Sequence, residues 1–288
     1  MRNAGEATRT AIVLFTYDRP DALSRTLDSL EAARDTWLKE RNAEQNLPLI
    51  VSLDGPRATP ESRQRVRDVH AMVRRRLPDA EIRTQAVNRG LPTILMETLT
   101  PLFSAAQYHR AICIEDDVEL APTALLALES LSDALGARGE TERGHVVSAA
   151  PMHHDGSVEH QALLIDATAH QASLPFVREY IDRFQLDGAT RDGAYGDRDH
   201  EAITEWSAAV ARHDGLAAPQ GTSQDRMREL AWHRAGVTLL GTPMRLVRHR
   251  GLWGQHNTPW YALRTGQLFQ RVDRSPWRSI EARLTKRS

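Results

Sequence analysis

Four apolar runs divide the first half of the chain, and polar residues follow each of them. The runs cover residues 11–15, 49–53, 81–87 and 111–114, and the third is the most polar. An apolar run without alternation is typical of a strand that is covered on both faces, as in a parallel sheet. We therefore expect four strands, with residues 111–114 as a central one.

Apolar residues at helical spacing separate these runs. One helix is expected after the first run, and others over residues 60–76, 92–99 and 124–135. The positions that share a helical face in the first two helices are Leu23, Leu27, Leu30, Val66, Val69 and Val73. Strands and helices that alternate in this way predict an α/β fold, with a mainly parallel sheet flanked by helices.

The regular alternation ends near Pro151. Beyond the first four runs, strands are expected at residues 145–150, 162–165, 237–240 and 244–247. Helices are expected near residues 176–184, 201–212 and 223–235. We expect this second half to belong to the same domain as the first.

Charge adds one feature to this picture. The chain of 288 residues has a formal net charge of -1, which argues against a general binder of nucleic acid or of membrane surfaces. Residues 241–288, however, contain ten Lys or Arg residues against two acids, Asp273 and Glu281. Such a basic segment suits an anionic ligand or an acidic partner, or it forms a solvated surface.

Cysteine content and hydropathy exclude further classes. Cys113 is the only cysteine, so the chain can form no internal disulfide and no zinc site built on several thiolates. Residues 1–10 carry no apolar stretch of signal-peptide length, and no later segment approaches the ~18 apolar residues of a membrane span. We therefore expect a cytoplasmic protein without a membrane span.

Polar residues gather where the expected strands end, and ligands of open α/β sheets bind outside these ends. The residues are Thr16, Arg19, Asp54, Arg89, Glu115, Asp116 and Asp117. Three adjacent carboxylates repel one another and normally need a cation, for which a divalent ion with oxygen ligands is the natural choice. The alternative is an acidic turn that precedes the next helix and interacts favourably with its dipole.

Two common phosphate-binding motifs are absent. No Gly-x-Gly-x-x-Gly follows the first run, and no Gly-x-x-x-x-Gly-Lys-Ser/Thr occurs anywhere in the chain. Dinucleotide and P-loop sites are therefore not expected. The cations and carboxylates at the strand ends instead suit a phosphate-bearing ligand that is held through a metal ion.

Over roughly residues 10–260 the chain resembles the GT-A glycosyltransferases, which transfer sugars from nucleotide donors. The likeness rests on a strand that ends in a DXD-type acidic motif, here Glu115-Asp116-Asp117. The motif in its setting resembles the N-acetylglucosaminyltransferase I branch, as do residues 15–20 and 52–55. The resemblance implies a nucleotide-sugar-binding half over residues 11–150 and an acceptor-binding and catalytic half over residues 151–260. A tail would precede them at residues 1–10, and a basic tail would follow at residues 261–288.

The resemblance also implies roles for the residues at the strand ends. Asp117 would bind Mn²⁺ or Mg²⁺, which would bridge the two phosphates of the donor. Asp116 and Glu115 would hold hydroxyls of the ribose or the donor sugar, and Asp54 would accept a hydrogen bond from the base. Thr16, Arg19 and Arg89 would line the nucleotide or diphosphate side.

An inverting transferase also needs a base for the acceptor hydroxyl. Asp225 is the candidate, because it begins an expected helix late in the chain, where related enzymes carry an acid. The alternative is that Asp225 only favours the helix N-terminus, with Ser223 or Thr222 as the cap. The competing acids are Asp197, Asp199, Glu201 and Glu205.

Many members of the class complete the metal site with a histidine from a C-terminal loop. His256 is the first candidate here and His249 the second, and Trp253 could stack on the donor sugar or lie in the core. In this respect the chain departs from the N-acetylglucosaminyltransferase I branch, where no histidine ligand is expected. The identity of the donor sugar therefore stays open.

These expectations describe a metal-dependent, inverting glycosyltransferase that uses a nucleoside diphosphate sugar, with a uridine diphosphate (UDP) sugar favoured. The acceptor could be a glycan, a natural product or a protein. One alternative is a sugar-phosphate nucleotidyltransferase, although residues 15–20 contain no glycine for the Gly-rich loop that it would need. Another alternative is a protein that binds nucleotide sugars without catalysis.

Overall fold

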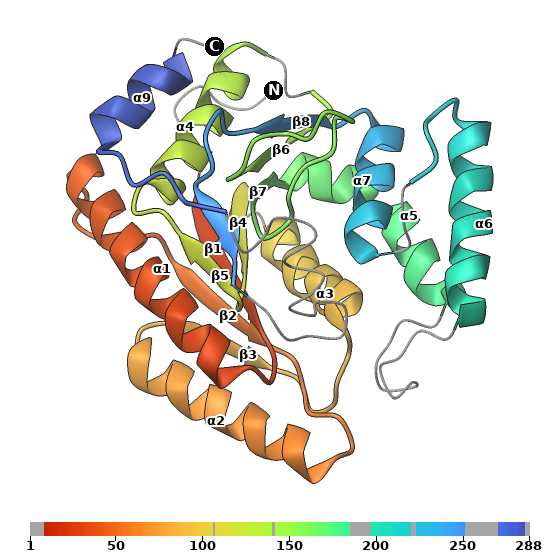
Figure 1. Ribbon diagram of the computed structural model, residues 1–288, viewed down its shortest axis with the longest axis horizontal. Coiled ribbons are helices and arrows are strands. Elements are labelled where there is room, and N and C mark those ends of the chain that lie inside the picture. Colours follow the sequence, from red (N-terminus) through yellow and green to blue (C-terminus); the bar gives the residue numbers. More distant parts are fainter. Residues whose placement is uncertain are drawn as a thin grey trace.

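The computed structural model describes residues 9–105, 107–139, 142–184, 197–219, 223–250 and 270–285. Its centre is a seven-stranded sheet with helices on both faces (Figure 1). In spatial order the strands are β3 (Glu81–Thr84), β2 (Leu49–Leu53), β1 (Thr10–Thr16), β4 (Arg110–Glu115), β7 (Ala162–Asp166), β6 (His145–Ser148) and β8 (Thr238–Gly241). Strands β1 to β4 are parallel to one another, and β6 is parallel to β8. Only β7 runs against its neighbours in this sheet, so the expected mainly parallel α/β fold is confirmed.

The strands alternate their side chains between two helical layers. Ile12 and Leu14 of β1 pack with α1 (Pro20–Arg41), α2 (Pro60–Arg76), α4 (Ala124–Ala137) and α9 (Trp277–Thr285). Val13 and Phe15 pack on the opposite face with α3 (Leu91–Ser104) and with Trp232 of α7 (Gln224–Ala235). This alternation follows from the two-residue period of a strand, and it explains why both faces of each central strand are apolar.

A third apolar cluster lies beside the sheet. It joins α5 (Ala167–Phe184), α6 (Asp197–His213) and α7 through Phe176, Tyr180, Ile203 and Leu230. Figure 1 places α6 at the outer edge of this cluster, with α5 and α7 between it and the sheet. The second half of the chain thus extends the fold sideways.

Several boundaries differ from the expected ones. β3 ends at Thr84 rather than at residue 87, and α3 continues to Ser104 through Pro101. α5 begins at Ala167 rather than near residue 176, and Pro175 lies inside it. The backbone N–H of Ala169 donates to Asp166 Oδ1 at 2.6 Å, so the helix is capped well before the proline. A proline is usually placed in a first helical turn, which is why the sequence predicted the later start.

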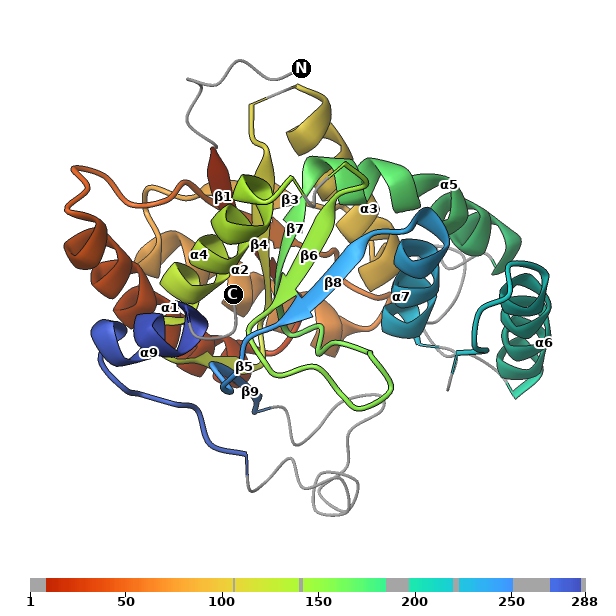
Figure 2. The same ribbon diagram turned by 90° about the horizontal axis from the view of Figure 1, so that it is seen from above.

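Two elements were not expected. β5 (Val118–Leu120) pairs antiparallel with β9 (Val247–His249) in a separate small sheet at one end of the large one (Figure 2). Helix α9 lies in the segment that was taken as a tail, yet Ile280 and Leu284 of α9 are buried in the core. β9 also replaces the strand expected at residues 244–247.

Among the described residues, no helix combines the length and the apolar composition needed to cross a bilayer.

Candidate functional site

The acidic triplet lies in the tight connection between β4 and β5. Thr26 of α1 holds this connection, because its Oγ1 lies 2.8 Å from the carbonyl oxygen of Asp116 and 2.9 Å from that of Val118. The same hydroxyl accepts the N–H of Val118 at 3.1 Å. A single buried hydroxyl therefore fixes the backbone on which the acids are carried.

Arg19 lies directly on two of the acids. Its Nη2 donates to Asp116 Oδ1 at 2.5 Å, and its Nη1 donates to Asp117 Oδ2. Burial lowers the pKa of Arg19, but the carboxylates of Asp116 and Asp117 outweigh burial, so its pKa lies above its usual range. The expected place of Arg19 was the diphosphate side. In this structure its guanidinium instead supplies the positive charge that the acids need.

Asp116 is further held by β1 and the residue after it. Its Oδ2 accepts the hydroxyl of Thr16 at 3.2 Å and the backbone N–H of Tyr17 at 2.9 Å. Burial raises the pKa of Asp116 although Arg19 opposes it. Burial, Asp225 and Asp117 together raise the pKa of Glu115 well above its usual value. The acids therefore share a buried and strongly polar environment.

His249 joins the site from the far end of the chain. The pairing of β5 with β9 places Val118 opposite His249, and His249 Nε2 lies 3.0 Å from Asp117 Oδ2. Despite burial, the pKa of Asp117 is lowered because His249 and Arg19 stabilise the carboxylate. The second candidate for a histidine ligand is thus brought beside the acid that was expected to bind the metal.

The donor set around Asp117 fits a divalent cation in part. Asp117 Oδ1 is buried without a hydrogen-bond partner, and an imidazole stands next to the same carboxylate. Among the described residues, no group of three or more His, Cys, Asp or Glu side chains is arranged to hold a metal ion by itself. Mn²⁺ or Mg²⁺ would accordingly draw further ligands from phosphate or water, as Mg²⁺ sites with one or two protein ligands do. His256 and Trp253 lie outside the described residues.

Asp54 organises the neighbouring loop. Its Oδ1 accepts the N–H groups of Gly55 at 2.8 Å and Arg89 at 2.7 Å, and its Oδ2 accepts Asn88 Nδ2 at 2.9 Å and Gly90 N–H at 3.0 Å. Burial nevertheless raises its pKa. A carboxylate accepts about four such bonds, so a nucleotide base would have to share or displace one of them.

The side chain of Arg89 contacts α3. Its Nη2 donates to Glu97 Oε1 of α3 at 2.7 Å. Its backbone therefore belongs to the loop that Asp54 gathers, while its guanidinium lies along α3. The roles expected for Asp54 and Arg89 in nucleotide binding stay predictions.

Asp225 lies in the first turn of α7, as expected. Ser223 is the N-cap, accepting the N–H of Arg226 at 3.4 Å, which agrees with the capping interpretation. Asp225 also contributes to the raised pKa of Glu115, so the two carboxylates lie on the same side of the sheet. Its side chain keeps 36% of its surface exposed and can meet a ligand.

The competing acids lie elsewhere. Glu201 and Glu205 belong to α6, which packs at the outer edge of the third cluster, away from β4 (Figures 1 and 2). The side chains of Asp197 and Asp199 lie outside the part of the chain that the structure describes. Among the candidate bases with described side chains, Asp225 is therefore the one whose charge acts on the triplet, through Glu115.

Two clusters of contacts near the site were missed by sequence reasoning. His160 lies between Asp225 and Glu229, 3.4 Å and 3.3 Å from their carboxylate oxygens. Glu119 of β5 is contacted by three arginines, Arg248, Arg250 and Arg274. The one feature of the sequence that could have indicated these contacts was the spacing of Asp225 and Glu229, which puts them on one face of a helix.

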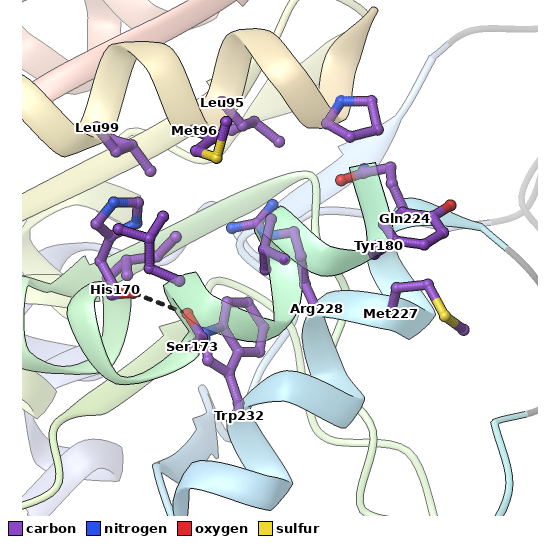
Figure 3. A pocket seen from close by; sticks show the side chains of 14 residues that line it. Leu95, Met96, Leu99, His170, Ser173, Tyr180, Gln224, Met227, Arg228 and Trp232 are labelled. Atoms are coloured by element: carbon purple, nitrogen blue, oxygen red, sulfur yellow. Dashed lines mark hydrogen bonds between the residues drawn. The ribbon is translucent and has the colours of Figure 1, made fainter. Parts of the chain in front are cut away.

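A small cavity lies between α3, α5 and α7 (Figure 3). Its volume of about 30 Å³ accommodates one or two water molecules and no sugar. Leu95, Leu99 and Trp232 line it, together with His170, whose pKa burial and nearby arginines lower to about 4. This cavity is part of the packing and is separate from the acidic site.

Comparisons with known proteins place the chain in no family. No family model and no curated protein matches it. Among solved structures, S. aureus TarS 1-349 in complex with UDP-GlcNAc has 11% identity and a TM-score of 0.43, covering 86% of this chain and 60% of that one. Another structure of S. aureus TarS has 11% identity and a TM-score of 0.40, covering 81% and 35%. A "mannose-1-phosphate geranyltransferase" from Thermus thermophilus has 15% identity and a TM-score of 0.36, covering 65% and 66%.

The chain thus spans between 35% and 66% of these three proteins. TM-scores below 0.5 carry no argument about this chain. We base the functional assignment on the geometry of the acidic site alone.

Proposed function

We propose that this protein is a metal-dependent, inverting glycosyltransferase of the GT-A type, with a UDP-sugar as the favoured donor. The observation that carries the proposal is the pair of Asp117 and His249 beyond the end of β4, where Asp117 Oδ1 is buried without a partner. A carboxylate oxygen and an imidazole nitrogen suit Mn²⁺, and they leave coordination positions for the phosphate oxygens of a donor.

The protein residues have distinct tasks in this proposal. Asp117 and His249 hold Mn²⁺ or Mg²⁺, and His256 is a further candidate ligand. The bound cation would supply Lewis-acid stabilisation of the charge on the departing diphosphate. Arg19 pairs with Asp116 and Asp117 and favours their ionised forms, because a neighbouring positive charge stabilises a carboxylate.

The remaining candidate residues position the donor. Glu115 and Asp116 accept hydroxyls of the ribose or the sugar, and Thr16 orients Asp116. The loop that Asp54 gathers, with Arg89, lines the nucleotide. Trp253 remains the proposed stacking partner of the sugar ring.

Asp225 is the proposed base. The acceptor oxygen attacks the anomeric carbon of the donor sugar from the face opposite the diphosphate. As the new C–O bond forms, the acceptor proton moves to Asp225, and the old C–O bond breaks with its electron pair going to the diphosphate. Asp225 can take part because it is partly exposed and faces Glu115 at the same edge.

Calorimetric titration with UDP, with and without Mn²⁺, tests the proposal. We expect wild-type protein to bind UDP with at least about tenfold higher affinity in Mn²⁺, since a cation held by Asp117 and His249 would attract the phosphates. Asp117→Ala should abolish that gain. Asp35→Ala, which removes an exposed acid of α1, is the matched control and should bind like the wild type.

Three outcomes would contradict this assignment. Binding that ignores both Mn²⁺ and the Asp117→Ala change would remove the metal site. Binding without any turnover of UDP-sugars would identify a non-catalytic binding protein, and release of pyrophosphate from a nucleoside triphosphate would identify a nucleotidyltransferase.

A further inference from the structure

His160 is a buried histidine that the expected mechanism does not use. It lies in the segment that leads into β7, two residues before Ala162, and its side chain is only 5% exposed. The next residue, Gln161, accepts the backbone N–H of Glu115 at 3.2 Å, so His160 is tied closely to the end of β4. Its imidazole stacks on Trp232 with ring centroids 5.4 Å apart and planes at 12°.

The two ring nitrogens of His160 face two carboxylates of α7. Nδ1 lies 3.4 Å from Asp225 Oδ1, and Nε2 lies 3.3 Å from Glu229 Oε1. Asp225 and Glu229 are four residues apart, so both project from one face of the helix. Both ring nitrogens are buried and neither makes a hydrogen bond of normal geometry, as is often the case for catalytic contacts before substrate binds.

Glu229 is itself firmly held. Its Oε1 accepts the backbone N–H of Val158 at 2.8 Å, and its Oε2 accepts Arg226 Nη1 at 2.7 Å. His160 and these donors lower the pKa of Glu229 in spite of its burial. Glu229 is therefore a fixed, ionised anchor on the far side of the imidazole from Asp225.

The protonation form of the imidazole decides how many of the two carboxylates it can donate to. A neutral ring has one N–H and can donate to one carboxylate, whereas the imidazolium donates from both nitrogens. A carboxylate oxygen stands beside each ring nitrogen of His160, so Asp225 and Glu229 can each accept an N–H of the ring. An N–H of the ring directed at Asp225 would fix the orientation of that carboxylate, with Glu229 holding the ring from the other side.

We propose that His160 is a positioning residue for the reaction, anchored by Glu229 and stacked on Trp232, which holds the Asp225 carboxylate oriented toward the acceptor. The inference rests on the proposed function and deepens it. His160 itself is too buried to touch the substrate, so it acts through Asp225. The acceptor proton still ends on Asp225.

Most charged groups around this cluster are already paired. Glu159 accepts two bonds from Arg245 at 2.5 and 2.6 Å, and Glu229 is paired with Arg226. Arg228 of α7 lies over the ring of Trp232, 5.0 Å from its centroid. Asp225, with its partly exposed carboxylate, is accordingly the group whose orientation should respond most to His160.

Hydrolysis of UDP-glucose, UDP-galactose and UDP-N-acetylglucosamine in the presence of Mn²⁺ provides the assay, with water as the acceptor. His160→Phe retains the aromatic stack but removes both N–H groups. We expect kcat to fall on the order of 10-fold to 100-fold with the donor KM unchanged. His160→Gln, which keeps an N–H donor, should recover part of the rate.

A double variant separates positioning from a general structural role. In an Asp225→Asn background, His160→Phe should cost less than about twofold more, since both changes remove the same function. A full additional loss, or a raised donor KM with kcat unchanged in His160→Phe, would overturn the role of His160 while leaving the glycosyltransferase proposal intact. Wild-type protein that hydrolyses none of the three donors would overturn both. Donor affinity measured by calorimetry verifies that each variant is folded, and His160→Gln serves if His160→Phe is not.

Discussion

Charged side chains near the acidic site lie beside groups of opposite charge. Arg19 pairs with two buried carboxylates, and Glu119 pairs with three arginines. Breaking a buried ion pair leaves an uncompensated charge, which generally costs more than the pair contributes. The loss of stability on substitution at these positions should therefore depend on the charged partner that is left unpaired.

His170 should make stability depend on pH. Its folded pKa of about 4 lies below the usual value of 6.5. The unfolded chain therefore binds the proton more readily, and the contribution of His170 is complete above pH 6.5 and is lost as the pH falls toward 4. From pH 7 to pH 5 we expect the free energy of unfolding to fall by about 2 kcal/mol through this residue.

Urea denaturation at pH 7 and pH 5 measures this effect. His170→Gln should flatten the difference, and His154→Gln, at an exposed histidine, should leave it unchanged. An equal pH dependence in wild type and His170→Gln would show that the buried imidazole does not titrate as expected.

The geometry of the acidic site depends more on the connections between elements than on the strands of the large sheet. The turn between β4 and β5 depends on α1 through one hydroxyl, that of Thr26, which serves three backbone groups. Small strands of three residues, such as β5 and β9, have little stability of their own. Their pairing nevertheless decides where His249 lies.

Thr26→Val tests this connection. It keeps the shape of the side chain but leaves buried backbone groups without a partner, which should cost about 1–3 kcal/mol of unfolding free energy. The affinity for UDP in Mn²⁺ should fall as the turn loosens. Thr26→Ser retains the hydroxyl and should stay close to wild type in both measurements. Unchanged stability in Thr26→Val would assign the turn to other contacts.

The last described helix, α9, packs against the core of the molecule. α9 packs on α4, and Ile280 and Leu284 enter the larger core cluster. The ion pair of Arg283 with Asp273 at 2.7 Å adds a polar contact and, with Ser275, lowers the pKa of Asp273 to about 2. The basic end of the chain is thus partly structural.

Ile280→Ala should destabilise the fold by about 2–4 kcal/mol, because it leaves a cavity in the core. Urea denaturation measures the loss, and Glu281→Ala, at the exposed neighbour, is the control. A loss below about 0.5 kcal/mol, the range of surface substitutions, would mean that α9 does not contribute to the core.

Local pattern was sufficient for most of the architecture. The strands at residues 11–15, 49–53 and 111–114 and the helix at residues 60–76 were predicted because apolar spacing reports directly on burial. The acids after β4 could also be predicted as a group, since strand ends of a parallel sheet share one edge. The start of α5 was wrong because the chain tolerates Pro175 inside a helix that Asp166 caps earlier.

The sequence alone therefore established the α/β class and the acidic edge, because these follow from the order of residues within short segments. The neighbours of the acids depended on folding. His249 meets Asp117 through β5 and β9, and His160 meets Asp225 through β7 and α7. The reason is physical: such contacts join segments far apart in the chain, and no local periodicity records which segments pack together.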